Sequence, residues 1–127
     1  MIAASVFAAC VAVAVVFQWA LVAGAPWAHL TMGGRYASAT NRLPVGARIA
    51  CLLQSGVLIA MAVWLSRFSA GSLPTGWSAN LVWLIVGISA LSFVANTITP
   101  SAAERKLWMP VTFAMLVSSV IVGVKGG

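Results

Sequence analysis

The segment over residues 2–23, IAASVFAACVAVAVVFQWALVA, decides the fold class, because no charged side chain interrupts it. A transmembrane helix needs about 20 mostly apolar residues to cross roughly 30 Å of hydrocarbon. No Lys or Arg precedes the run, and it exceeds the length of about 7 to 15 residues that is typical of a signal-peptide core. We therefore expect it to be a retained membrane-spanning helix.

Three further segments have the same character. Arg48 and Arg67 enclose the second, turn signals at 74–76 and Pro100 bound the third, and Lys106 and Lys125 enclose the fourth. The expected helices cover about 2–23, 48–67, 78–96 and 103–124, and a loop covers about 24–47. The sequence thus predicts one all-α integral membrane domain, a bundle of four transmembrane helices.

Composition excludes several other classes of protein. Hydrophobic residues make up 62% of the 127 residues and charged residues only 6%, whereas a soluble domain carries about 25% charged residues. A soluble enzyme, a disordered chain and a disulfide-rich secreted domain are therefore excluded. The net charge of +6 does not predict nucleic-acid binding, because the basic residues punctuate apolar runs instead of clustering on one face.

The basic residues predict an orientation, since Lys and Arg are enriched in cytoplasmic loops. Five lie at the first and third loops: Arg35, Arg42, Arg48, Arg105 and Lys106. Arg67 and Lys125 lie at the opposite side. We expect both termini outside and the two basic loops in the cytoplasm. Tryptophans prefer membrane interfaces, and Trp27, Trp64, Trp77 and Trp108 stand within a few residues of the expected helix ends.

The sequence offers little for catalysis or metal binding. It has two cysteines, one histidine and a single acid, Glu104, so it lacks paired carboxylates, an Asp-containing triad and a zinc ligand set. Cys10 and Cys51 are expected at different depths in the membrane, which argues against a disulfide. We therefore expect neither an enzyme nor a cofactor.

Several side chains near the basic loops are candidates for contacts at the cytoplasmic face: Trp27, His29, Arg35, Arg42, Arg48, Glu104 and Arg105. His29 has no acid nearby, and interfacial packing beside Trp27 is the simpler interpretation. Glu104 follows Ser101 in the capping-box pattern S-x-x-E, and Thr99 before Pro100 is an alternative cap. A cytoplasmic contact or a proton site is the functional alternative for Glu104.

Polar residues within the spans indicate helix contacts or a water-lined path. Gln18 and Gln54 are expected at similar depths, about 7.5 and 9 Å from the cytoplasmic helix ends, so we predict an amide pair between the first two helices. Two polar stripes follow helical spacing: Ser89, Ser92 and Asn96 on the third helix, and Thr112, Ser119 and Gly123 on the fourth. Such stripes more often pack helices closely than line a path.

Short loop motifs suggest a relationship. The motifs are Pro26-Trp27, Gly33-Gly34-Arg35, Leu43-Pro44 with Arg48, Asn96, Thr99-Pro100-Ser101, Glu104-Arg105, Trp108 and Pro110. With the four spans they resemble a group of uncharacterised small four-span bacterial membrane proteins. The resemblance implies the four-helix architecture and a bacterial inner membrane, and it implies no activity.

The function that we predict from the sequence is a non-enzymatic accessory or structural role. Its partners would be membrane lipids and other membrane protein subunits or further copies of the chain. The alternative is a small oligomeric channel or transporter with a path lined by Ser, Thr and Asn. A lipid-modifying enzyme would need a nucleophile with a base or a metal, which the residues do not offer.

Overall fold

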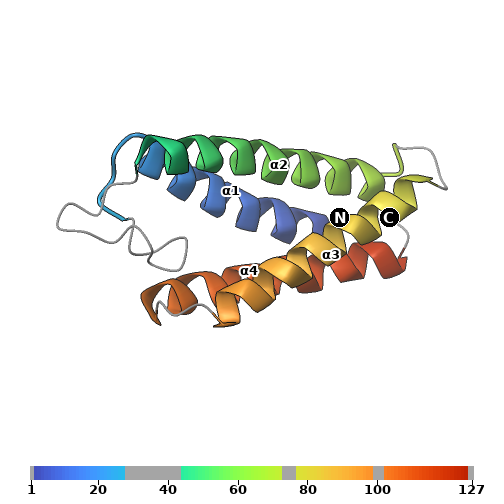
Figure 1. Ribbon diagram of the computed structural model, residues 1–127. Coiled ribbons are helices and arrows are strands. Elements are labelled where there is room, and N and C mark those ends of the chain that lie inside the picture. Colours follow the sequence, from blue (N-terminus) through green and yellow to red (C-terminus); the bar gives the residue numbers. More distant parts are fainter. Residues whose placement is uncertain (1, 28–43, 73–76, 99–101, 126–127) are drawn as a thin grey trace.

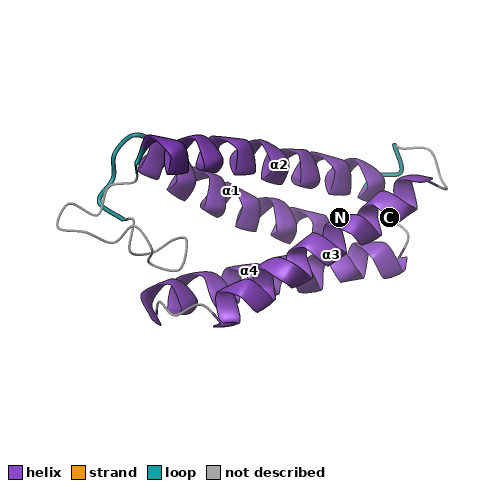
Figure 2. Ribbon diagram, viewed as in Figure 1, coloured by secondary structure: helices purple, strands orange, loops and turns teal. Residues whose placement is uncertain are grey.

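The computed structural model describes residues 2–27, 44–72, 77–98 and 102–125. These residues form four helices: α1 (Ile2–Val22), α2 (Val45–Ser69), α3 (Trp77–Ile98) and α4 (Ala102–Lys125). Every regular element among them is a helix (Figure 2). The prediction of an all-α fold with four membrane-spanning helices is therefore confirmed.

The helix ends differ from the expected ones by up to three residues. α2 begins at Val45, because Pro44 takes an extended conformation (φ −67°, ψ 164°) and its carbonyl accepts the Arg48 backbone N–H at 3.0 Å. Charge positions alone placed this end at Arg48, inside the helix. α1 and α2 are each followed by a glycine with a positive φ, Gly24 (+103°) and Gly71 (+73°). Such a glycine is a common way to end a helix.

The helices form two antiparallel pairs, α1 with α2 and α3 with α4 (Figure 1). α1 also packs against α4, whereas α2 and α3 contact each other little. Both termini lie at one end of the bundle (Figure 1). Hydrogen bonds and ring contacts between helices give the register, with Gln18 of α1 opposite Ser55 of α2 and Phe93 of α3 opposite Phe113 of α4.

Most of the apolar core lies in the half of the bundle that holds the termini. Its buried members come from all four helices: Ala4, Phe7, Val11, Val15, Met61, Leu65, Val82, Ile85, Met115 and Val122. We call this set the main core. A second, smaller cluster of Leu21, Ala47 and Cys51 joins α1 and α2 at the opposite end. Cys10 packs against the main core and Cys51 belongs to the smaller cluster, so the two free thiols lie in different parts of the bundle.

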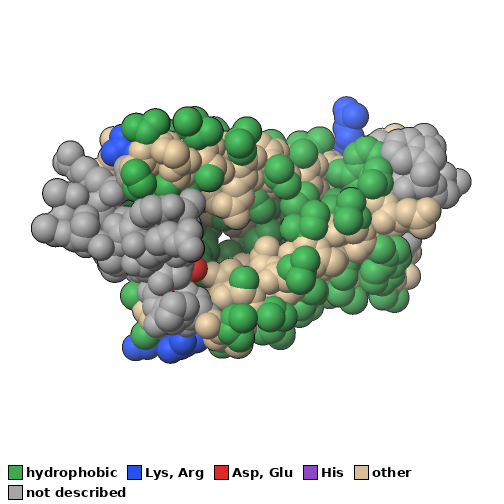
Figure 3. Space-filling view, in the orientation of Figure 1, with side chains coloured by type: hydrophobic (Ala, Val, Ile, Leu, Met, Phe, Trp, Pro, Cys, Tyr) green, Lys and Arg blue, Asp and Glu red, His purple; other side chains and the backbone are tan. Residues whose placement is uncertain are grey.

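All four helices are long and apolar enough to cross a membrane. Hydrophobic side chains are spread over the helices on the face seen in Figure 3, and large side chains such as Leu53 (69% exposed) and Leu91 (72% exposed) face outward. A soluble protein would seldom expose apolar patches of this extent. The chain is therefore a small multi-pass membrane protein.

Candidate functional site

One pocket of about 230 Å³ lies between the helices, in the half of the bundle away from the termini. We call it the polar pocket. Its polar side chains come from all four helices: Gln18, Gln54, Ser92, Asn96, Glu104 and Thr112. Figure 3 shows the molecule hollowed between the two helix pairs, with the one carboxylate of the chain at the edge of the hollow. This side lies between α2 and α3, the helices that contact each other little.

Aromatic side chains form one wall of the polar pocket. Trp108 of α4 and Phe17 of α1 line it together, with ring centroids 4.8 Å apart in an edge-to-face arrangement. On its other side Phe17 stacks against Trp27, at 5.6 Å between centroids. Trp108 lies near a helix end as expected, but its side chain is only 9% exposed. It lines the pocket, so its indole is turned into the bundle instead of outward.

The predicted contact between α1 and α2 involves Gln18, but its partner differs from the predicted one. Ser55 Oγ donates to Gln18 Oε1 at 2.7 Å, and it also lies 2.7 Å from the carbonyl of Cys51. A hydroxyl carries one hydrogen, so both contacts are satisfied when the Gln18 amide turns over and its nitrogen donates to Ser55 Oγ. Gln54 is the neighbour of Ser55, about 100° around the helix, and its exposed side chain lines the pocket instead.

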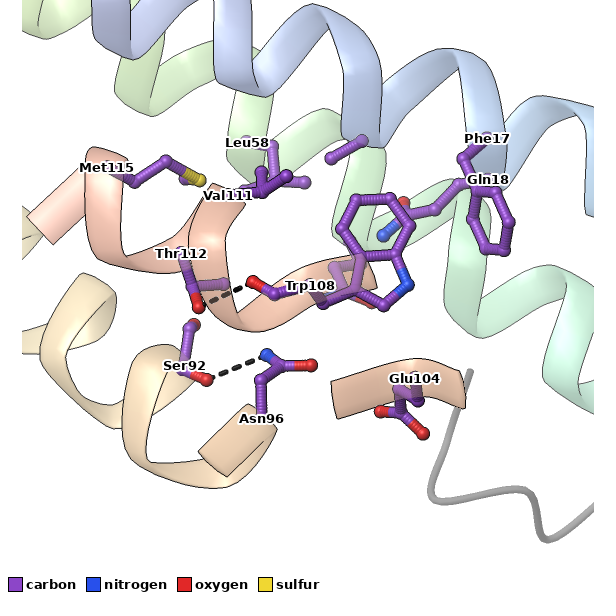
Figure 4. Close-up of a pocket in the computed structure, with 12 residues that line it drawn as sticks. Phe17, Gln18, Leu58, Ser92, Asn96, Glu104, Trp108, Val111, Thr112 and Met115 are labelled. Atoms are coloured by element: carbon purple, nitrogen blue, oxygen red, sulfur yellow. Dashed lines mark hydrogen bonds between the residues drawn. The ribbon is translucent and has the colours of Figure 1, made fainter. Parts of the chain in front are cut away.

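The polar stripes of α3 and α4 divide between the pocket and the packed interior. Ser92, Asn96 and Thr112 line the pocket. Asn96 Nδ2 donates to the Ser92 carbonyl at 2.7 Å, and Thr112 Oγ1 donates to the Trp108 carbonyl at 2.8 Å (Figure 4). Both residues thereby use a donor on the backbone of their own helix and keep oxygen lone pairs.

The other members of the stripes lie deeper in the bundle, where they pack. Ser89 (1% exposed) and Ser119 (0% exposed) are fully buried, and Ser119 Oγ donates to the Leu116 carbonyl of its own helix at 2.9 Å. A Cβ atom added to Gly123 would lie 3.1 Å from the Trp83 ring, so the absence of a side chain there permits close approach of α3 and α4.

Glu104 lies in the first turn of α4 and is only 8% exposed. The positive end of the helix dipole favours a carboxylate at this position. Ser101, its expected capping-box partner, lies outside the described residues, as do Thr99 and Pro100. Among the residues that the structure describes, Glu104 is the one charged residue that lines the polar pocket.

Three other candidates for contacts lie within the described residues, and none of the three lines the pocket. Arg48 donates from Nη1 to the Val22 carbonyl at 3.5 Å, which places a cation at the C-terminal end of α1, where the helix dipole favours it. Arg105 is half-buried and Trp27 is 40% exposed. His29, Arg35 and Arg42 lie outside the described residues.

Sequence reasoning did not identify Phe17, Ser55 and Trp108 as parts of the site. For Trp108 a signal was present, because it follows Glu104 by four residues and therefore shares its side of α4. Among the described residues no group of His, Cys, Asp and Glu could hold a metal ion.

Comparison with known proteins found no matching family model, no matching curated protein and no matching solved structure. The functional argument therefore depends on the residues of the chain itself.

Proposed function

We propose that the chain is a non-enzymatic accessory component of a bacterial inner membrane, and that it associates with lipids and with other membrane protein subunits or further copies of itself. The observation that supports this most is that apolar side chains close the polar pocket on the side of the main core. Ala14, Leu58, Val111 and Met115 line the pocket with apolar groups, and Met115 also belongs to the main core.

Beyond Met115, the main core occupies the space between the four helices. Ser89 and Ser119 lie in this half, but they are fully buried among packed helices. A polar solute or ion that entered the pocket would have to cross this apolar layer without polar partners, which is costly. A path through a single copy of the chain is therefore disfavoured.

The outer faces of the helices supply the surface for association. Four short spans bury little of their own apolar surface, and residues such as Val16, Leu53 and Leu91 project outward from three different helices. Helices in membranes associate through packing of complementary faces. A photoreactive side chain at Leu53 should therefore crosslink to lipid and to a neighbouring protein, whereas one at Leu65 (0% exposed) should crosslink only within the chain.

The alternative, a channel or transporter, has one observation in its favour, since Ser92, Asn96 and Thr112 line a polar pocket. Reconstituted proteoliposomes distinguish the two functions. We expect wild-type protein to give no flux of ions or small solutes above that of protein-free vesicles, with a known pore as positive control.

The variants Ser92→Leu and Ser119→Leu complete the test. A bulky apolar side chain at either position would obstruct a path, whereas in a packed interior it would disturb assembly by about 1 to 3 kcal/mol. A solute-specific flux that Ser92→Leu abolishes, with assembly intact, would overturn the accessory role.

A further inference from the structure

We propose that the polar pocket binds a small organic cation that carries N–H donors, either a primary ammonium or a guanidinium group. Glu104 is its counter-charge and Trp108 its aromatic wall. The proposal goes beyond the accessory role and does not depend on it, because a ligand site inside the bundle and a partner on its outer surface are separate features.

The charge of the pocket favours a cation. Glu104 is the only acidic residue of the chain, and it is buried where it lines the pocket. No lysine or arginine of the described segments lines the pocket with it. A carboxylate offers about four acceptor positions, so Glu104 can bind a ligand in addition to its contacts within the protein.

The hydrogen-bonding groups favour a ligand that donates. Asn96 and Thr112 each use a donor on a backbone carbonyl, at 2.7 and 2.8 Å. Asn96 keeps its second amide N–H and the lone pairs on Oδ1, and Thr112 keeps the lone pairs on Oγ1. Gln18 and Gln54 carry amides that can donate or accept, so they fit either kind of ligand. An anion would be repelled by the carboxylate of Glu104 and would meet only lone pairs at Thr112 Oγ1.

The aromatic wall favours a positive charge on the ligand. Tryptophan is the most effective partner for a cation placed over an aromatic ring, and the edge-to-face contact with Phe17 holds Trp108 in place. Figure 4 shows Asn96 and Glu104 on one side of the Trp108 side chain and Thr112 beside the Trp108 carbonyl. A carboxylate, neutral oxygens and an indole around one space form a site for an organic cation.

The volume and position of the pocket define the ligand further. Sites for drug-sized molecules measure about 300 to 1,000 Å³, so a pocket of about 230 Å³ suits a smaller group. It lies near the end of a membrane-spanning bundle, where lipid headgroups reside. The ammonium could therefore come from a free amine or from the ethanolamine headgroup of a phospholipid, and the chemistry of recognition would be the same.

The test is isothermal titration of ethylammonium into the full chain in phosphatidylcholine nanodiscs. We expect saturable binding by the wild type, and weaker binding of tetramethylammonium, which has no N–H donors. Glu104→Gln should lower the affinity for ethylammonium at least tenfold. Lys106→Gln is the matched control, because it neutralises an exposed charge on the same helix outside the pocket. Its affinity should stay within about twofold of the wild type.

A second variant protects the test against misfolding. Asn96→Ala removes the Oδ1 acceptor from the side of α3 and should lower the affinity severalfold, while circular dichroism and gel filtration confirm a folded protein. Absence of saturable binding by the wild type, or equal affinities for wild type and a folded Glu104→Gln, would overturn the proposal. Neither result would affect the crosslinking and flux tests of the accessory role.

Repeating the titration in phosphatidylethanolamine nanodiscs identifies the source of the cation. A tenfold weaker affinity for ethylammonium in those nanodiscs would identify the lipid headgroup as the occupant. An unchanged affinity would identify a free amine.

Discussion

The hydrogen bond between Gln18 and Ser55 gives the sharpest test of how the first helix pair is held together. The bond joins two buried side chains, 9% and 2% exposed, across the α1–α2 contact at 2.7 Å. Interhelical hydrogen bonds of this kind contribute about 0.6 kcal/mol on average and up to about 1.7 kcal/mol. Ser55→Ala and Gln18→Leu should each lower the free energy of unfolding by about 1 kcal/mol.

The double variant measures the interaction itself. Because either single change already breaks the bond, the double change should cost less than the sum of the two by about 0.6 to 1.7 kcal/mol. The measurement is reversible unfolding in mixed micelles by a denaturing detergent, followed by circular dichroism and tryptophan fluorescence.

The matched control uses the neighbouring amide. Gln18 is bonded to Ser55, whereas Gln54 lines the pocket with an exposed side chain, so the coupling between Gln18→Leu and Gln54→Leu should be smaller than the coupling between Gln18→Leu and Ser55→Ala. A coupling between Gln18 and Gln54 larger than that between Gln18 and Ser55 would refute the reasoning and would favour the amide pair that the sequence alone predicts.

Three further predictions concern packing, topology and the cysteines. Gly123→Leu should destabilise the protein by about 1 to 3 kcal/mol in the same unfolding assay, because the side chain would meet Trp83, whereas Gly87→Leu, with open space around its Cβ position, should change stability by less than about 0.5 kcal/mol. In a Cys10→Ala, Cys51→Ala background, an impermeant thiol reagent should label Ser72→Cys in intact cells and should not label Ser38→Cys; the reverse pattern would invert the proposed orientation. Oxidation of the folded wild type should give no intrachain disulfide on a non-reducing gel, and a band with a shifted mobility in the monomer range would contradict the separate placement of Cys10 and Cys51.

The fold could be predicted from the sequence because the signal in each span is long. An uninterrupted apolar run such as 2–23 predicts a membrane helix, because a helix satisfies the backbone hydrogen bonds within the segment where no water is present. The helix ends were predicted less accurately. A charged residue marks where the membrane-spanning part of a helix can end, but the helix itself can continue beyond it. Arg48 illustrates this, as it lies inside α2 with its guanidinium at the end of α1.

The site could be predicted only in part. The depth of a residue in the membrane follows from counting residues along its helix, whereas the rotation of the helix about its own axis does not. The count placed Gln18 level with Gln54 and, within one residue, with Ser55. Only the rotation of α2 decides which of the two faces α1, and neighbouring residues differ by about 100° around the axis. The rotation of α4 likewise turns Trp108 inward, although a tryptophan near a helix end suggests contact with the membrane interface.

The position of the polar pocket follows from the volumes of the side chains between the two helix pairs. The pairs lie closer together at the end with the termini than at the opposite end (Figure 1). At the wider end the rings of Phe17 of α1 and Trp108 of α4 meet edge to face, whereas the packed side chains of the main core fill the narrower end. The two rings do not fill the space between the helix pairs at this end. The unfilled part is the polar pocket, which Gln18, Asn96 and Glu104 line. The aromatic pair thus forms one wall of the pocket at the wider end, where polar groups of all four helices meet outside the main core.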